Sequence, residues 1–316
     1  QPGLSWFVLR RCAPGTNHAR LGLQVKRMLA GRCARGVYML EYNDLGLRYD
    51  NENLLFHYTK TSTAITKILY SRALKFGPLS KTNDPMEFKD PIQMLTADFH
   101  IDRDDTFRIL EEIRKAADDR KNKVQLLCFS IDKFENGQTY SGGMHEKGWA
   151  RSRMWAQYAE NHKGVCLVFY KDKLLIEIDK EIKKRRLKSI QVICDRIKYS
   201  NDVKEYENAF SVDITEQNVK DDFTNFYLKN KEQFLFQKLE DYRDEQEYRI
   251  VLLKDNGMNG IEISVNIENA IAGIITGCDF EPAFNVNIQR ISEKYNIPCF
   301  HIDWEYGSPS LYKLFG

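Results

Sequence analysis

Short apolar runs alternate with longer helical patterns over most of the chain, and this alternation predicts a mixed α and β domain. The apolar runs are rich in Val, Ile, Leu and Phe and are flanked by turn-forming residues, as is typical of buried strands. We expect strands at residues 54–58, 73–76, 124–130, 164–169, 191–197, 248–253, 261–265, 271–276 and 299–302.

Apolar residues recur at helical spacing in most of the intervening segments. We expect helices from Thr61 or Ser62 onward and over residues 86–97, 106–118, 152–161, 216–239 and 283–295. The segments that join the strands include both hairpin-length and helix-length links. We therefore expect an α+β fold with a mixed, mostly antiparallel sheet core and flanking helices.

The first 38 residues differ from the rest of the chain. They contain seven Lys and Arg residues and no acid, and they show no sustained helical or strand periodicity. Met39 then opens a sequence that is typical of a protein start. We expect residues 1–38 to be a poorly structured N-terminal extension or an expression remnant, and residues 39–316 to form a single domain. An Arg-rich organellar presequence is the alternative, but such peptides are usually rich in Ser, and only Ser5 occurs here.

Composition and charge limit the classes of protein. Hydrophobic residues make up 42% of the chain and charged residues 29%. No apolar run approaches the roughly 18 residues of a membrane span, so we expect a water-soluble, cytoplasmic protein without a membrane partner. After the first 38 residues, 40 basic and 45 acidic residues remain, which makes the body mildly acidic. The seven cysteines are scattered without a C-x-x-C pair, which favours a reducing compartment over a disulfide framework or structural zinc.

Several enzyme classes lose support because their motifs are absent. The chain has no G-x-x-x-x-G-K-[ST], G-x-G-x-x-G, G-x-S-x-G or H-E-x-x-H sequence. The six histidines show no metal-ligand spacing among themselves or with cysteines, so we expect no metal cofactor. Standard kinase, hydrolase and zinc-protease functions are therefore disfavoured.

A dispersed set of motifs remains. These are H-Y-T at residues 57–59, N-D-P-x-E at 83–87, C-F-S at 128–130, W-x-x-Y-x-x-x-H-x-G-V at 155–165 and K-x-x-x-Y-x-x-E-x-E-Y-R at 238–249. In this order the motifs resemble a large bacterial domain family of unknown function that is often seen near phage-defence genes. The resemblance spans about residues 54–305. That family is in turn distantly similar to the ADP-ribosyltransferase superfamily.

The superfamily resemblance implies a binding site for NAD⁺. It assigns His57 to an NAD⁺ ribose or amide, with Thr59 beside it, and Ser130 to the hydroxyl residue at the end of a second strand. Tyr158 is the candidate for the aromatic residue that packs on nicotinamide, although the superfamily usually places that aromatic on a strand.

The resemblance also implies that Glu247 is the catalytic carboxylate and Glu245 its E-x-E partner. Breaking the bond from nicotinamide to ribose passes through an oxocarbenium-like cation, which a carboxylate stabilises. If both glutamates lie in one strand, their side chains point to the same face. We expect Glu247→Gln to abolish activity and to leave the fold intact.

Structural explanations compete with functional ones at single motifs. Asp84 in N-D-P is most simply a helix cap, and Trp155 is most simply a core residue, because aromatic residues on helices usually pack. An E-x-E sequence is usually a solvated strand edge. The basic run is either a nucleic-acid contact or a solvated surface. It consists of Lys183, Lys184, Arg185 and Arg186.

Together these features favour an NAD⁺-dependent ADP-ribosyltransferase that acts as a bacterial toxin or anti-phage effector. The sequence favours RNA or DNA over protein as the acceptor, and an antitoxin or chaperone partner is consistent with such a role. Two other functions stay open. One is a non-catalytic sensor or binding module of the same fold, and the other is a nuclease that uses Asp84, Glu87 and the late glutamates with a divalent metal ion.

Overall fold

A computed structural model of the chain describes residues 47, 52–82, 84, 103–121, 124–135, 138–139, 143–187, 189–201, 225–227, 229–254 and 262–315. All of these lie in the unit Met39–Gly316. The expected N-terminal extension, residues 1–38, and the helix expected over residues 86–97 lie outside the described residues.

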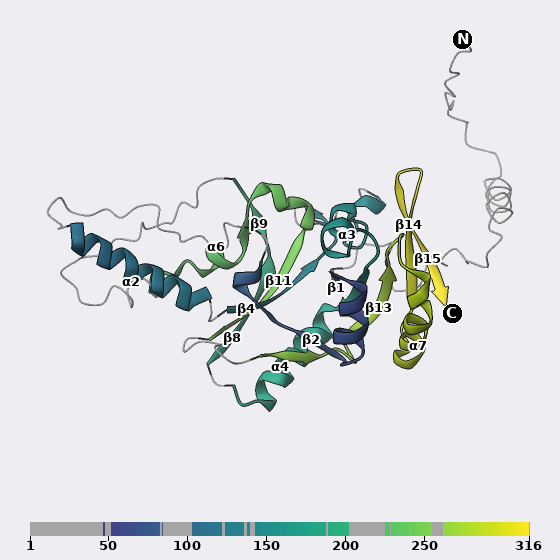
Figure 1. Cartoon of the computed structure of the whole chain (residues 1–316), viewed down its shortest axis with the longest axis horizontal. Coiled ribbons are helices and arrows are strands. Elements are labelled where there is room, and N and C mark those ends of the chain that lie inside the picture. The colour runs from purple at the N-terminus through teal and green to yellow at the C-terminus, as the bar shows by residue number, and fades with distance from the viewer. Residues whose placement is uncertain are drawn as a thin grey trace, which may run out of the picture. The chain divides into compact units, whose positions relative to one another are not determined.

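One large sheet forms the centre of this unit (Figure 1). Its strands follow the order β15-β14-β13-β7-β1-β4-β11-β8, with β3 pairing against β4. The strands are β1 (Leu54–Thr59), β3 (Gly77–Pro78), β4 (Val124–Ser130), β7 (Val165–Tyr170), β8 (Ile190–Arg196), β11 (Glu247–Lys254), β13 (Ile271–Thr276), β14 (Cys299–Glu305) and β15 (Ser308–Phe315). Within this sheet only β13 and β14 pair in parallel, so the expected mixed, mostly antiparallel sheet is confirmed.

Helices and short strand pairs surround the sheet. The helical elements are η1 (Thr63–Leu69), η2 (Leu79–Lys81), α2 (Arg103–Lys121), η4 (Met144–Glu146), α3 (Ser152–Tyr158), α4 (Lys171–Lys184), α6 (Lys231–Leu235), η5 (Glu240–Glu245), η6 (Pro282–Phe284) and α7 (Asn285–Tyr295). The strand pairs are β2 (Ala73–Lys75) with β12 (Ser264–Asn266), β5 (Phe134–Glu135) with β6 (Gln138–Thr139), and β9 (Lys198–Tyr199) with β10 (Gln237–Lys238).

Both faces of the central strands are buried, which explains why their sequences read as continuous apolar runs. Phe56 on β1 packs in a core with Trp155 of α3, and the expected core position of Trp155 is confirmed. The neighbouring Leu55 points to the other face and packs in a core with Leu174 of α4 and Ile288 of α7. Because side chains alternate along a strand, β1 holds the two layers together.

Three of the longer elements differ from the sequence-based expectation. The helix expected over residues 216–239 ends earlier in the described part of the chain, because α6 stops at Leu235 and the backbone then enters β10. Tertiary pairing causes this difference, since β10 pairs with β9. The sequence also did not predict helix α4 or the last strand, β15.

Residues 162–165, the H-x-G-V part of the motif at residues 155–165, form a tight connection between α3 and β7. Glu160, Asn161 and His162 adopt positive φ angles of 53°, 50° and 67°. A Cβ atom on Gly164 would lie 2.4 Å from the carbonyl oxygen of Thr59 and 2.7 Å from Cα of Ala159. Glycine is therefore required here because three backbone segments lie too close together to admit a side chain.

Replacing Gly164 with alanine is expected to lower the free energy of unfolding by about 1–3 kcal/mol, because the new methyl group meets backbone atoms that move only with β1 and α3. Urea denaturation measures this loss. Gly77→Ala is the matched control, since a Cβ there meets only the Leu126 carbonyl oxygen at 3.9 Å. Equal stability of the two variants would contradict the predicted tight packing at Gly164.

Candidate functional site

Strands β1 and β4 are neighbours that pair at a single position, Phe56 with Ser130. A cavity of about 470 Å³ opens between them, which we call the β1–β4 cavity. Such a volume falls in the range of small-molecule sites. Its lining includes Phe56, His57, Tyr58, Cys128, Phe129, Ser130, Met154, Gln157, Tyr158, Lys238, Glu245 and Glu247. The structure thus brings together His57, Ser130, Tyr158, Glu245 and Glu247 from four separate segments.

His57 spans the gap between the two diverging strands. Its Nδ1 lies 3.2 Å from the backbone oxygen of Cys128 on β4, and its ring lies 5.7 Å from that of Phe129. Because a carbonyl can only accept, Nδ1 carries the proton in this hydrogen bond. Burial lowers the pKa of His57 below its usual value, which favours the neutral ring. Nε2 is then an acceptor for a hydroxyl or amide donor.

Four buried charged residues form a network at the end of this cavity, which we call the Lys238 cluster: Lys238, Glu245, Glu247 and Arg249. Nζ of Lys238 lies 2.7 Å from Oε2 of Glu245 and 2.6 Å from Oε2 of Glu247. Nε of Arg249 donates to Oε1 of Glu247 at 2.7 Å. All four side chains are at most 5% exposed, so two carboxylates and two cations neutralise one another out of water.

The two glutamates do not share a strand, so the prediction of one common strand face is wrong. Glu245 ends the 3-10 helix η5, whereas Glu247 begins β11. Between them Gln246 adopts the left-handed conformation, with φ of 43° and ψ of 55°. This turn, together with Lys238, directs both carboxylates to one point.

Two of the predicted residues hold Glu245 in position. The hydroxyl of Tyr158, at the end of α3, donates to Oε1 of Glu245 at 2.6 Å. Oγ of Ser130 donates to the backbone oxygen of Glu245 at 2.7 Å, so this hydroxyl fixes the corner before β11. Thr59 is buried and lines neither the β1–β4 cavity nor the second cavity described below.

The Lys238 cluster sets the ionisation of its neighbours. Burial by itself would raise the pKa of Glu247, but the charges of Arg249 and Lys238 outweigh burial and lower this pKa to about 2. Burial and the charge of Glu247 raise the pKa of the Cys128 thiol well above its usual value. At neutral pH, Glu247 is therefore an anion and Cys128 a neutral thiol.

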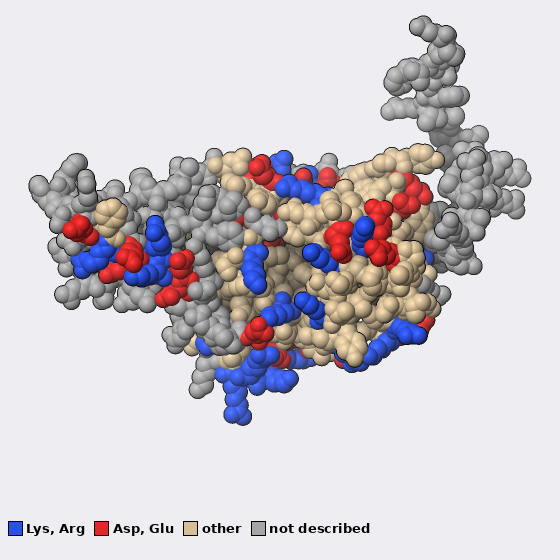
Figure 2. Space-filling model, viewed as in Figure 1, with Lys and Arg blue, Asp and Glu red and all other residues tan. Residues whose placement is uncertain are grey.

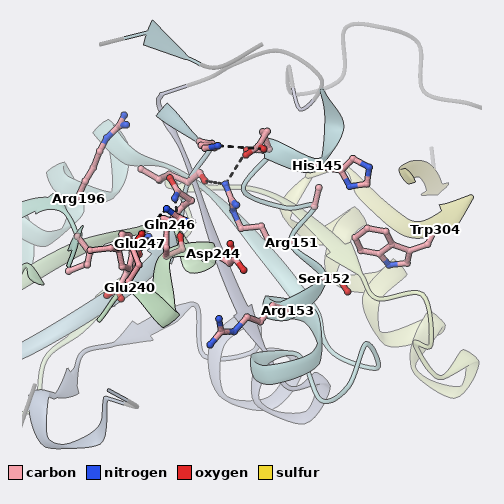
Figure 3. Close-up of a pocket in the computed structure, with 17 residues that line it drawn as sticks. His145, Arg151, Ser152, Arg153, Arg196, Glu240, Asp244, Gln246, Glu247 and Trp304 are labelled. Atoms are coloured by element: carbon pink, nitrogen blue, oxygen red, sulfur yellow. Dashed lines mark hydrogen bonds and ion pairs between the residues drawn. The ribbon is translucent and has the colours of Figure 1, made fainter. Parts of the chain in front are cut away.

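A second cavity, of about 740 Å³, lies on the other side of Glu247 (Figure 3). We call it the arginine cavity, because Arg151, Arg153, Arg196 and Arg243 line it. Glu247 lines both cavities. The E-x-E motif is thus the wall between an apolar, aromatic cavity and a polar one.

The structure does not bring the basic run, Lys183 to Arg186, to either cavity. The run ends helix α4, and Figure 2 shows basic side chains gathered at the lower edge of the view, over the end of α4. The run lies just before Ile190 in the sequence. Ile190 pairs with Lys254, and Lys254 lies at the opposite end of β11 from Glu247. At about 3.4 Å per residue, the two ends of β11 are roughly 24 Å apart.

Most charges of the basic run are paired within α4. Lys183 contacts Asp179, whereas Lys184 and Arg185 contact Glu181. Such i to i+3 and i to i+4 pairs are typical of solvated helix surfaces. A nucleic-acid contact at this run would be made away from Glu247.

The structure describes Asp84 but not Glu87 among the carboxylates considered for a divalent metal ion. Asp84 is buried, and its Oδ2 accepts from the backbone N–H of Leu239 at 3.1 Å, just before η5. Glu87 lies outside the described residues. Within the described part of the chain, no group of three or more His, Cys, Asp or Glu side chains is arranged to hold a metal ion.

Lys238 and Arg249 belong to the motif at residues 238–249, but the sequence assigned neither of them a role in the site. The structure makes them the counter-ions of Glu247. The signal was present, because two basic residues at a fixed spacing from two buried glutamates are the partners that such carboxylates need. The arginine cavity gave no comparable signal, since its residues come from distant segments.

One comparison with known proteins gave a match. Residues 154–250 match a family described as "Protein of unknown function (DUF2971)". The match runs from Met154 on α3 to Ile250 on β11, and it contains Tyr158 and the whole Lys238 cluster. Neither the curated proteins nor the solved structures gave a match. Among the described helices, none has both the length and the apolar content needed to cross a membrane.

From the charges of the Lys238 cluster we predict that the free energy of unfolding falls in acid. Because the folded pKa of Glu247 lies below the unfolded value of about 4.3, its ionisation stabilises the fold above that pH. This contribution is lost as the pH falls toward 2. Glu247→Gln should cost about 3–5 kcal/mol at pH 7, because it leaves Lys238 and Arg249 without their shared anion. This revises the expectation that the substitution leaves the fold intact.

Urea denaturation of the wild type and of Glu247→Gln at pH 7, 5, 4 and 3 provides the measurement. The difference in unfolding free energy between the two proteins should shrink below about pH 4. Taking the difference removes the contribution of other acidic groups. An equal difference at pH 7 and at pH 3 would show that Glu247 does not carry the acid sensitivity.

Proposed function

We propose that this protein is an NAD⁺-dependent ADP-ribosyltransferase whose NAD⁺ site is the β1–β4 cavity. One observation carries the proposal. The superfamily resemblance selects six residues from distant parts of the sequence, and five of them line a single cavity: His57, Ser130, Tyr158, Glu245 and Glu247.

The cavity offers groups that suit the nicotinamide and ribose portion of NAD⁺. The neutral ring of His57 presents Nε2 as an acceptor for a ribose hydroxyl or for the carboxamide N–H. Phe129 and Tyr158 supply aromatic surface for a planar ring. Ser130 acts through the backbone of Glu245 and is a positioning residue.

Glu247 is the proposed catalytic carboxylate. When the bond between ribose C1′ and the nicotinamide nitrogen breaks, its electron pair leaves with nicotinamide and positive charge develops on the ribose. An ionised carboxylate with a pKa of about 2 stabilises this charge. The acceptor then bonds to C1′ and releases its proton to water. Glu245, held by Tyr158, is the proposed partner that orients the ribose.

For the biological role we propose a bacterial toxin or anti-phage effector that modifies a nucleic acid. This part of the proposal rests on the resemblance of the ordered motifs. It is compatible with an antitoxin or chaperone partner.

A second candidate function is a non-catalytic binding module of the same fold. The Lys238 cluster has no net charge, because Lys238 and Arg249 compensate both carboxylates. This favours a function in binding. A compensated carboxylate attracts a ribose cation less than a lone one does. Binding of NAD⁺ without release of nicotinamide would identify this second function.

Release of nicotinamide from NAD⁺ in the presence of RNA or cell lysate tests the proposed activity. Glu247→Gln should slow this release by about 10²–10³-fold, because the variant lacks the charge that opposes the ribose cation. Glu177→Gln is the matched control. Glu177 is a buried glutamate of α4, paired with Lys180 and Asn269, and it lines neither cavity.

Glu247→Gln removes a buried ion pair and Glu177→Gln a partly exposed one. Circular dichroism must therefore first show that each variant is folded at the assay temperature. Full activity of a folded Glu247→Gln protein would end the transferase proposal. Equal losses in Glu247→Gln and Glu177→Gln would show that the effect is one of stability alone.

His57 predicts the pH dependence of NAD⁺ binding. Since burial lowers its pKa, the ring stays neutral from pH 8 down to its usual value of about 6.5. We expect the KM for NAD⁺ to stay constant over this range and to rise below it, as protonation removes the acceptor at Nε2. His57→Gln should raise KM and make it independent of pH, because an amide oxygen accepts at every pH. Steady-state kinetics between pH 5 and 8 measure both effects. Equal KM values for the wild type and His57→Gln at pH 7 would remove His57 from the binding site.

A further inference from the structure

The arginine cavity carries an excess of positive charge. Lys133 and four arginines line it, against four carboxylates. The carboxylates are Glu146, Glu240, Asp244 and Glu247. Glu247 is already neutralised by Lys238 and Arg249, which do not line this cavity. Glu146 pairs with Lys133 at 3.7 Å and Glu240 pairs with Arg243 at 2.7 Å.

Arg151 forms no direct ion pair among the described residues of this cavity, and the charges of Glu146 and Asp132 act on it from a greater distance. Its Nη2 donates to the carbonyl oxygens of Ile131 at 3.3 Å and Glu146 at 3.1 Å, which fixes the guanidinium in place. Its Nε–H is buried and has no hydrogen-bond partner among the described residues. Leaving a buried donor of a charged group unpaired costs free energy, so a resident acceptor would stabilise this arrangement.

A second buried donor without a partner among the described residues belongs to Trp304, which lines the same cavity. Nε1 of Trp304, on β14, is buried, and within the described part of the chain nothing accepts its hydrogen. Figure 3 shows Arg151 in the middle of the cavity, between Gln246 and Glu247 on one side and Trp304 on the other. An acceptor-rich anion with a planar part would lie between these two side chains.

We propose that the arginine cavity binds a nucleotide unit of a nucleic-acid acceptor, with its phosphate on Arg151 and its base against Trp304. Guanidinium groups recognise phosphate oxygens through paired donors, and indole rings stack on bases. Arg153, which contacts the backbone oxygen of Asp241 and lines the cavity, adds positive charge for the same phosphate.

The position of the cavity assigns the nucleotide unit to the acceptor. Glu247 separates the arginine cavity from the β1–β4 cavity, so a ligand here approaches the same carboxylate from the opposite side. The role as acceptor site rests on the proposed transferase function. Binding of the phosphate does not, and it can be measured without NAD⁺.

Isothermal titration of the full chain with adenosine 5′-monophosphate, in the absence of NAD⁺, tests the site. We expect one molecule to bind, and adenosine without the phosphate to bind at least tenfold more weakly. Arg151→Gln should weaken binding of the monophosphate at least tenfold. Trp304→Phe, which keeps an aromatic ring and removes the N–H, should weaken it about fivefold. Arg290→Gln on the exposed surface of α7 is the matched control and should change nothing.

A single-stranded oligoribonucleotide should displace the bound monophosphate, and His57→Gln should leave its affinity unchanged. Failure of the wild type to bind the monophosphate at millimolar concentration would overturn the proposal. Equal affinities of the wild type, Arg151→Gln and Trp304→Phe would do the same. If circular dichroism shows that Arg151→Gln is unfolded, the affinity of Trp304→Phe for the monophosphate decides the test.

Two further results would overturn the assignment to a nucleic-acid acceptor. One is a loss of monophosphate binding in His57→Gln, which would place the ligand in the β1–β4 cavity. The other is an oligoribonucleotide that fails to displace the monophosphate. Absence of nicotinamide release, with the binding results as expected, would overturn the transferase function and leave the phosphate site standing.

Discussion

The ion pairs between Lys238 and two buried glutamates are the constraint on which the site depends. Lys238 reaches Glu245 and Glu247 at 2.7 and 2.6 Å, and it comes from β10, outside the main sheet. Burying one of these charges without the others would cost several kcal/mol. The fold of the segment from β10 to β11 and the electrostatics of the site are therefore a single feature.

This cluster also explains how two unlike cavities lie side by side. The β1–β4 cavity exists because β1 and β4 pair only at Phe56 and Ser130 and then diverge. The arginine cavity begins beyond Ser130, at the next residue, Ile131. Glu247 pairs with Ser130 in register, so it stands where one cavity gives way to the other. Glu247 therefore borders both cavities.

The sequence predicted much of the sheet because its central strands are buried on both faces. Continuous apolar runs such as residues 124–130 and 271–276 are typical of strands that are covered on both faces. The sequence did not predict helix α4, because its many charged residues hide the apolar pattern of a helix. In this helix only Leu174, Glu177 and Ile178 are buried. The end of the helix expected near Leu239 was wrong because tertiary pairing of β10 overrides local helical periodicity.

The sequence by itself determined the α+β class and most strands, and its ordered motifs named five of the residues that line the β1–β4 cavity, since apolar periodicity and ordered motifs are local properties of a chain. Only the tertiary structure decided how these residues interact. It assigned Ser130 to the backbone of Glu245, left Thr59 outside the cavities and gave Glu247 its two counter-ions. Arg151 and Trp304 meet at one cavity although 153 positions separate them, and the pattern of a single sequence carries no distance between such residues.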